Sequence, residues 1–422
     1  MVRAWGNRAL FGPTRQGAMA QFKGGSRAGG NQLARRQPAA PVAQPSVGGT
    51  NERAGRGKAG ALGGALISRG HGPALRRALL GTTSVAALGL ALAMAGPAFA
   101  EDWTGAASTN WFTDGNWLSG VPTSSDNAII DTITPNTTVV GGPGAQADRV
   151  SVGLNGTGML TIENGGTISN GDGYVGHNSN SNGTVTVDGA SSTWTNSGLL
   201  MVGYVGAGSL TIQNGGAVSN THGDIGSNST STGTVTVDGA GSTWTNSGTL
   251  DIGSSGTGTL IIENGGTVSN TEGIIGWIED SVGIVTVDGT GSTWTNSGTL
   301  TVANEGTGTL TIENGGAVSN AAGYIGAGPG STGAVTVDGA GSTWINTGDL
   351  RAGNLGIGTL TIKNGGVVSN TGGYIGFNSG STGTVTVDGA GSTWTNSGIL
   401  SVGESGTGTL TIQNGGDRPG RL

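Results

Sequence analysis

The chain has 422 residues, no cysteine, 89 glycines and only 10% charged residues. Without cysteine no disulfide can stabilise it, and the regular spacing of its Val, Ile and Leu residues argues against disorder. Residues 1–100 hold 13 of the 18 Lys and Arg, whereas residues 101–422 hold 5 basic and 24 acidic residues, and 5 minus 24 gives a net charge of −19. An acidic segment of this kind is a poor candidate for binding nucleic acid or anionic lipid.

We expect the chain to divide into five segments. These are a disordered basic leader or a stretch that follows a start site assigned too early (1–73), a signal peptide (74–100), an N-terminal start or cap of the folded stack (101–150), a set of repeats (151–416) and an aberrant tail (417–422). The first hundred residues are therefore expected to supply a disordered leader and a signal helix, and to stay out of the folded core.

A secretory signal is indicated just before the acidic part of the chain. A basic pair opens an apolar stretch (residues 76–95), and Ala98 and Ala100 form a small-x-small cleavage site. The alternative, a transmembrane helix, is disfavoured by the Ala, Gly and Thr content of the stretch and by the cleavage signature. The mature protein is expected to begin near Glu101, outside the inner membrane.

One 50-residue unit recurs from about Ser151 to Gly416 without a slip in register. A fixed period of this length indicates a repeat architecture. The columns that show it most clearly are Leu160, Leu210, Leu260, Leu310, Leu360 and Leu410, and Trp194, Trp244, Trp294, Trp344 and Trp394.

Each unit consists of two similar halves of about 25 residues. In each half an alternating run such as Leu160-Thr161-Ile162 precedes a Gly-rich turn and two further short runs. Alternation of apolar residues with Thr is typical of strands, and the many glycines disfavour helices. The sequence therefore predicts an all-β fold, a right-handed parallel β-helix (β-solenoid) with about 25 residues per coil and two coils per 50-residue repeat.

The alternation also predicts the core. Leu160, Val185 and Val187 are expected to point inward and the threonines between them outward, since a slip by one residue would reverse every side chain. The Leu and Trp columns are expected to form a core ladder. For the Trp column the alternative is an exposed row that stacks on sugar rings. The core is favoured because Trp194 takes the place that Ile168 takes in the other half-unit, although an inward Trp needs a partner for its N–H.

With the signal, the repeats and the absence of cysteine, the chain resembles the passenger region of a bacterial autotransporter (type V secretion). Its repeats are similar to those shared by autotransporters and PEP-CTERM proteins. This resemblance implies a rod that is exported through an outer-membrane β-barrel and displayed on the cell surface. The matching segments are G-T-L-T-I-E-N-G-G-T-V-S-N (258–270), G-T-V-T-V-D-G-A-G-S-T-W-T-N-S-G (233–248), and Trp103-Thr104-Gly105 with Asn116-Trp117 and Val121-Pro122.

The C-terminal residues depart from the resemblance. A further repeat begins at residues 408–416 and then changes into the sequence D-R-P-G-R-L (417–422), with no barrel after it. The sequence alone therefore suggests a truncated or frameshifted passenger, which would be periplasmic if its barrel is missing and at the cell surface or secreted if it is intact.

Residue types for catalysis are scarce, and we expect no enzyme, no catalytic residue, no cofactor and no metal site. His177 and His222 are the only histidines after the signal, so a Ser-His-Asp arrangement would depend on one of them. A polysaccharide hydrolase or lyase would need a carboxylate pair. Asp188 and its equivalents recur with the repeat and precede Gly, as turn residues do, and we find no cluster of catalytic types that departs from the repeat. Calcium-binding nonapeptide and EF-hand motifs are absent.

Two surfaces are candidates for ligand contact. Outward T-x-T pairs would line a flat face, which resembles ice-binding β-solenoids but also suits ordinary solvent-facing strands. One turn carries two large apolar residues where sister copies have small polar ones, which indicates either a contact spot or a local packing adjustment. The candidate contact residues are Thr184, Thr186, Thr234, Thr236, Trp277 and Ile278.

We therefore expect a structural rod for adhesion, aggregation or biofilm contact, because many weak identical patches suit multivalent attachment. Its expected partners are a host or neighbouring-cell surface, a polysaccharide or a second copy of the chain, with no nucleic acid. The alternatives are a β-helical carbohydrate-active enzyme or sugar-binding protein, and a non-functional fragment of a frameshifted gene.

Overall fold

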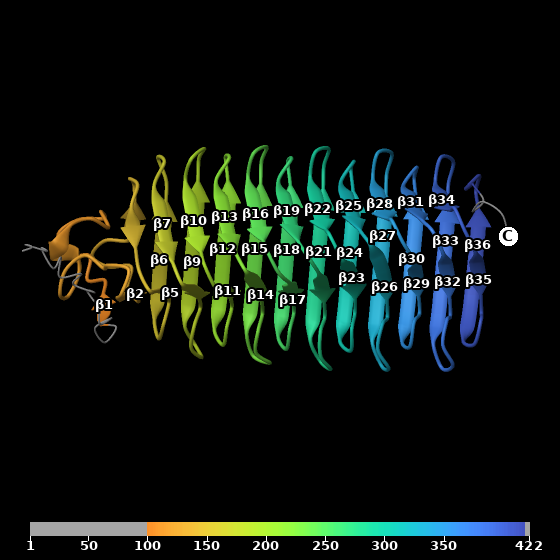
Figure 1. Cartoon of the computed structure of the whole chain (residues 1–422), viewed down its shortest axis with the longest axis horizontal. Helices are drawn as coiled ribbons and strands as arrows, with labels where there is room; N and C mark the ends of the chain where they lie inside the picture. The colour runs from red at the N-terminus through yellow and green to blue at the C-terminus, as the bar shows by residue number, and fades with distance from the viewer. Residues whose placement is uncertain (1–98, 418–422) are drawn as a thin grey trace, which may run out of the picture. The chain divides into compact units, whose positions relative to one another are not determined.

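The computed structural model describes residues 99–417, which form one stack of coils (Figure 1). The expected leader, residues 74–98 of the expected signal peptide and the tail after Asp417 lie outside the described residues. Apart from one short 3-10 helix, η1 (Asp114–Asn116), the regular structure is all strand, in three parallel sheets. The predicted β-solenoid is therefore confirmed. Within residues 99–417 no helix is long and apolar enough to cross a membrane.

The threonine sheet contains the alternating runs. From β6 to β33 its inward Leu, Ile and Val side chains are buried and the Thr side chains between them are half-buried, as the alternation predicts. Neighbouring strands pair in parallel, so that Thr186, Thr211 and Thr236 lie side by side on successive coils. Its twelve strands are β3 (Thr138–Val140), β6 (Thr157–Ile162), β9 (Asn182–Asp188), β12 (Ala207–Gln213), β15 (Thr232–Asp238), β18 (Thr257–Glu263), β21 (Val282–Asp288), β24 (Thr307–Glu313), β27 (Thr332–Asp338), β30 (Ile357–Lys363), β33 (Thr382–Asp388) and β36 (Thr407–Gln413).

The tryptophan sheet follows after the Gly-rich turn of each coil. Its strands carry the Trp column, which alternates along the stack with Ile or Val. Its eleven strands are β4 (Ala145–Gln146), β7 (Thr167–Asn170), β10 (Thr193–Asn196), β13 (Ala217–Asn220), β16 (Thr243–Asn246), β19 (Thr267–Asn270), β22 (Thr293–Asn296), β25 (Ala317–Asn320), β28 (Thr343–Asn346), β31 (Val367–Asn370) and β34 (Thr393–Asn396).

The third sheet, named the variable sheet for its outward residues, completes each coil. Its thirteen strands, seen along the lower half of the stack in Figure 1, are β1 (Ala100–Asp102), β2 (Asn127–Ile130), β5 (Arg149–Val152), β8 (Asp172–Val175), β11 (Leu199–Val202), β14 (His222–Ile225), β17 (Leu250–Ile252), β20 (Gly273–Ile275), β23 (Thr299–Val302), β26 (Ala322–Ile325), β29 (Leu350–Ala352), β32 (Gly373–Ile375) and β35 (Leu400–Val402).

The tryptophan ring explains why the repeat spans two coils. A Cβ atom on Gly173 would lie 2.8 Å from Cζ2 of Trp194 and 3.0 Å from Cδ1 of Leu200, both on the next coil. Only glycine fits beneath this ring and side chain. Coils with Trp and Leu therefore alternate with coils that carry Ile or Val and Gly, and the large and small side chains fill one core together.

Buried asparagines supply the partner that an inward Trp requires. The Trp194 N–H donates to Oδ1 of Asn170 at 2.7 Å, and Nδ2 of Asn170 donates to Oδ1 of Asn196 at 2.7 Å. The same pair of bonds recurs at each later Trp of the column. The bonded unit is again two coils, an Ile/Val coil and the Trp coil after it.

Three tryptophans close the N-terminal end of the core. Trp103, Trp111 and Trp117 are buried, with ring centroids 5.1 Å apart for Trp103 and Trp117 and 4.7 Å apart for Trp111 and Trp117. The Trp117 N–H donates to the Trp111 carbonyl at 2.7 Å, and the buried Asn116 amide accepts from the Ser108 N–H. The segment 101–150, which was expected to start the stack, thus adds three buried Trp side chains to the apolar core at the first coils.

Candidate functional site

Outward side chains differ in regularity between the sheets. The threonine sheet repeats Thr in most coils, and the tryptophan sheet repeats Thr, Ser and Ala. The central outward position of the variable sheet changes from coil to coil instead. In chain order this position holds Tyr174, Met201, Asp224, Asp251, Ile274, Thr301, Tyr324, Arg351, Tyr374 and Ser401.

Stacking of the coils depends on the inward residues and the turns, so the fold does not require this variation. The outward side of the variable sheet, with the turns that lead from it to the threonine sheet, is named the variable face. Two clusters of polar and aromatic side chains on this face depart from the repeat.

The first cluster is a pair of carboxyl groups, one buried (Asp251) and one half-buried (Asp224). Asp224 on β14 and Asp251 on β17 are cross-strand partners, and Asp251 is only 2% exposed. The Ser254 hydroxyl donates to Oδ1 of Asp224 at 2.7 Å, whereas Oδ1 of Asp251 has no hydrogen-bond partner among the described residues. Burial, and after it the negative charges of Asp224 and Glu272, raise the pKa of Asp251 to about 7. Burial also raises the pKa of Asp224.

The two histidines do not complete a Ser-His-Asp arrangement in the described residues. Nε2 of His222 lies 4.0 Å from Oδ2 of Asp251, but the Ser254 hydroxyl nearby is bonded to the other aspartate. His177 lies 3.5 Å from the Ser151 hydroxyl, measured from Nδ1, and stacks on Tyr174. Burial, and after it the charge of Arg149, lower the pKa of His177.

The second cluster joins an arginine to three aromatic rings. The Arg351 guanidinium carbon lies 5.5 Å from the ring centroid of Tyr324, 5.4 Å from that of Tyr374 and 4.2 Å from that of Phe377. A smaller version occurs near the N-terminal end, where Arg149 lies 5.3 Å from the Tyr174 ring. Cations over ring faces are attracted by the ring quadrupole.

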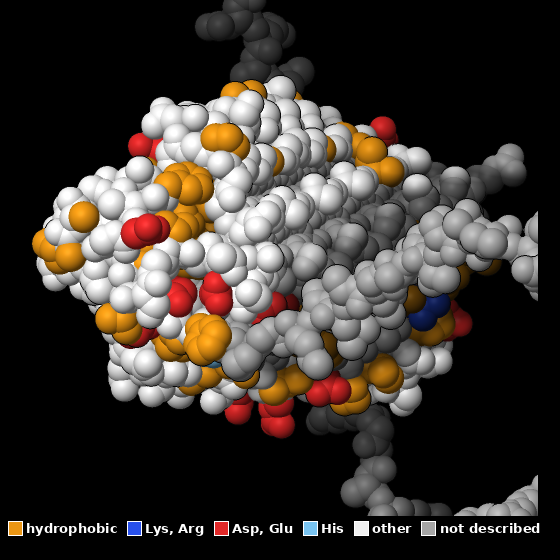
Figure 2. Space-filling model, turned by 60° about the vertical axis from the view of Figure 1, so that its left-hand side comes forward, with side chains coloured by type: hydrophobic (Ala, Val, Ile, Leu, Met, Phe, Trp, Pro, Cys, Tyr) orange, Lys and Arg blue, Asp and Glu red, His pale blue; other side chains and the backbone are white. Residues whose placement is uncertain are grey.

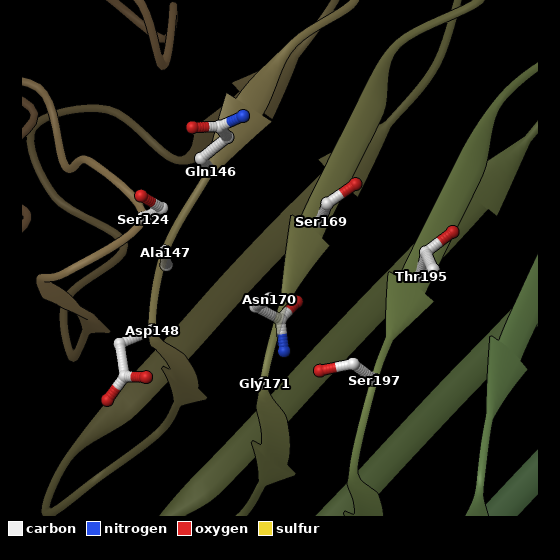
Figure 3. A pocket seen from close by; sticks show the side chains of 9 residues that line it. All are labelled: Ser124, Gln146, Ala147, Asp148, Ser169, Asn170, Gly171, Thr195 and Ser197. Atoms are coloured by element: carbon white, nitrogen blue, oxygen red, sulfur yellow. The ribbon is translucent and has the colours of Figure 1, made fainter. Parts of the chain in front are cut away.

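Hollows in the surface differ in what lines them. Figure 3 shows hydroxyl and amide side chains around a hollow of about 350 Å³, among them Ser169, Asn170, Thr195 and Ser197 from β7, β10 and the turn after β10. Asn170 serves there as the acceptor of a core Trp, and the other side of the hollow is formed by Ser124, Gln146, Ala147 and Asp148 of the N-terminal segment. Two further hollows lie on the variable face. One of about 550 Å³ is lined by turn residues such as Ser181, Val205 and Thr230, and one of about 520 Å³ contains Tyr324 and Arg351.

The structure does not bring the predicted contact residues together. Thr184 and Thr186 on β9 and Thr234 and Thr236 on β15 face outward from the threonine sheet, with β12 between them. Trp277 and Ile278 lie in the turn after β20, which belongs to the variable face. They are 41% and 43% exposed. Their role in ligand contact stays a prediction.

The Trp and Leu columns lie inside the stack. The five tryptophans of the column are at most 1% exposed, and the first five leucines are fully buried. Leu410, in the last strand of the threonine sheet, is partly buried. The Trp column therefore cannot be an exposed platform for sugar rings. Among the described residues no group of three or more His, Asp or Glu could hold a metal ion. Ala100 lies in β1, and Ala98 lies outside the described residues.

Comparisons with known proteins complete the description. No known protein family and no curated protein matches the sequence. Among solved structures the chain is similar to a crystal structure of a TibA fragment that was hyper-glycosylated by TibC, with 16% sequence identity and a TM-score of 0.43. The match covers 76% of this chain and 99% of that fragment. Similarity at this level carries no argument about function.

Proposed function

We propose that this chain is the exported passenger of an autotransporter-type protein and acts as a structural rod for adhesion or aggregation, with its contacts on the variable face. The observation that supports this most is the contrast between the sheets. Two sheets repeat their outward residues and serve the fold, and the third places acidic, cationic and aromatic side chains at equivalent positions of a regular scaffold. Binding residues carried by a rigid scaffold are the usual arrangement in repeat proteins.

The proposed partners are a neighbouring cell or host surface, a polysaccharide or a second copy of the chain. The visible face in Figure 2 is mostly uncharged, with scattered acidic side chains and little basic surface in view. A surface with so few cations disfavours nucleic acid as a partner. An outer-membrane barrel remains the proposed route of export.

An experiment on cells tests the proposal. Bacteria that produce the chain are expected to settle or attach faster than bacteria that lack it, and added protease should cleave the chain on intact cells. If the chain is protected from protease and attachment is unchanged when the gene is removed, the proposal is wrong.

One observation favours a second candidate function. Glycoside hydrolysis uses two carboxyl groups, one of them protonated near neutral pH, and Asp251 and Asp224 form a pair of that kind. The rod remains our proposal, without enzyme activity, because neither the hollow at Ser181 and Val205 nor the hollow at Tyr324 and Arg351 has Asp224 or Asp251 in its lining. Hydrolysis of a polysaccharide that Asp251→Asn abolishes would support the second candidate.

A further inference from the structure

The hollow at Tyr324 and Arg351 crosses three coils. Its floor contains Thr301 on β23, Tyr324 on β26 and Arg351 on β29, which are successive cross-strand neighbours. The turns beside these strands form its wall and supply Asn304 and Glu305. With neighbouring strands about 4.8 Å apart, a hollow across three coils has room for more than one small ring of a ligand.

Tyr324 presents one ring face to this hollow. Its neighbour on the following coil is Arg351, whose guanidinium carbon lies 5.5 Å from the ring centroid. Its neighbour on the preceding coil is Thr301, whose short side chain does not extend as far as a tyrosine ring. One face of the ring is therefore covered by a cation, and the other is left to a ligand.

Arg351 holds this ring in place. The guanidinium lies against Tyr374 and Phe377 on the far side, and its Nη1 atom lies 3.4 Å from Oδ1 of Asn354. Nη2 lies 3.7 Å from a carboxylate oxygen of Asp349. Nε of Arg351 is buried and has no hydrogen-bond partner among the described residues. A platform held from behind loses little freedom when a ligand binds, which favours affinity.

The wall of the hollow departs from the repeat. Asn178, Asn228 and Asn378 occupy one turn position in three sister copies, and each donates its side-chain amide to the preceding coil. The fourth copy has Gly328 there, followed by Pro329. A Cβ atom on Gly328 would clash with the backbone carbonyl of Asn304, so only glycine fits in this turn as it stands, and Gly328 and Pro329 line the hollow.

We propose that this hollow binds a neutral pyranose unit of a polysaccharide. The apolar face of the sugar ring lies on Tyr324, and its hydroxyl groups bond to Asn304, Glu305 and Thr301. A neutral sugar is favoured over an acidic one because Arg351, the cation that lines this hollow, is paired with Asp349 and shares the lining with Glu305, in a chain that is acidic overall. This inference names a ligand class for the proposed adhesion function and rests on it.

Saturation-transfer NMR on the intact chain tests the site directly. The probes are maltotriose, cellotriose and mannotriose, with trigalacturonic acid as the acidic comparison. At least one neutral trisaccharide should receive transfer at its ring C–H protons. Tyr324→Ala should weaken binding roughly tenfold or more, as expected when a central aromatic contact is lost, and Tyr324→Phe should retain it.

Two further variants separate binding from folding. Thr301→Tyr places at this outward position a residue type that Tyr174 and Tyr374 represent on other coils, so it should fold normally, cover the open face of Tyr324 and lose the sugar signal. Tyr204→Ala removes another half-buried tyrosine of the variable face that does not line the hollow, and it should bind like the unaltered chain.

The outcomes that would overturn the inference are also specific. They are transfer to none of the neutral trisaccharides, preferred binding of trigalacturonic acid, or an unchanged signal in the Tyr324→Ala and Thr301→Tyr variants. If cells still attach through the variable face while no sugar binds, the adhesion proposal stands and only the ligand class is wrong. If sugar binds and attachment does not depend on the chain, the adhesion proposal fails alone.

Discussion

A buried carboxyl group is unusual on the outward side of a strand, and Asp251 is such a group. Its partner on the preceding coil, Asp224, is 27 residues earlier, and its neighbour on the following coil, Ile274, is 23 residues later. A comparison of the sequence with itself at a constant shift of 25 residues therefore pairs the wrong residues of the variable sheet. The inward alternation at Leu160 and Val185 was predictable because each strand shows it locally. The carboxyl pair was not, because it depends on the unequal lengths of the turns.

The first prediction concerns pH and this pair. The pKa of Asp251 rises from 3.8 to about 7 on folding, so its neutral form is favoured in the fold. Stability is then greatest below the unfolded pKa and is lost as the pH rises through about 7, by at most about 4 kcal/mol. The negative charges of Asp224 and Glu272 also disfavour the ionised form of Asp251. A positive charge on His222 has the opposite effect on the carboxyl pair.

Thermal melting at pH 5 and pH 8 measures this effect. The unaltered chain should melt at a lower temperature at pH 8, and Asp251→Asn should remove most of the difference. Asp280→Asn, at an exposed turn, is the matched control and should melt like the unaltered chain. Equal pH dependence in Asp251→Asn and the unaltered chain would contradict the assignment.

At the scale of an element, the strands of the tryptophan sheet are joined by more than their backbone. The sequence predicted that Trp194 points inward and needs a partner for its N–H, but it did not identify Asn170, because that partner lies on the preceding coil at the end of another short run. The T-W-T-N and T-V-S-N runs are thus one bonded pair of strands. This pairing fixes the order of Trp and Ile/Val coils along the sheet.

The second prediction removes one such partner. In Asn270→Ala the buried Trp294 N–H loses its acceptor, and Oδ1 of Asn296 loses a donor. Leaving a buried polar group unpaired costs about 1–3 kcal/mol. Denaturant unfolding should report this loss, and Ser269→Ala, one residue away on the outward side, should cost much less. Comparable losses in both variants would show that the asparagine bond is unimportant.

At the scale of the whole molecule, the stack is a series of two-coil packing units. Each Trp coil fills the space over the glycine of the coil before it, as Trp244 and Leu250 do over Gly223. The 50-residue period was visible in the sequence, whereas its physical cause was not, because Gly223 and Trp244 lie in different sheets. The outward residues of the variable face do not follow this two-coil repeat and differ from one unit to the next.

The third prediction follows from the two-coil unit. Deletion of residues 232–256 removes one Trp coil and places two Ile/Val coils together, with an empty space where Trp244 and Leu250 lay. We expect a loss of roughly 3–5 kcal/mol, as for other large truncations in a core. Deletion of residues 232–281 removes two coils and keeps the alternation, so it should cost less although it removes twice as much chain. Melting temperatures compare the two, and a more stable single-coil deletion would contradict the packing account.

The central claim is that the variable face makes the contacts and the regular faces hold the rod. The most direct measurement compares cell settling for two fivefold variants that both retain the far-UV circular dichroism of the unaltered chain. We expect substitution on the variable face to slow settling towards that of cells without the chain, and substitution on the threonine sheet to leave it unchanged. Equal effects of the two variants, or loss only in the threonine variant, would contradict the claim. The substitutions are Asp224→Thr, Asp251→Thr, Tyr324→Thr, Arg351→Thr and Tyr374→Thr for the variable face, and Thr186→Ser, Thr236→Ser, Thr286→Ser, Thr336→Ser and Thr386→Ser for the threonine sheet.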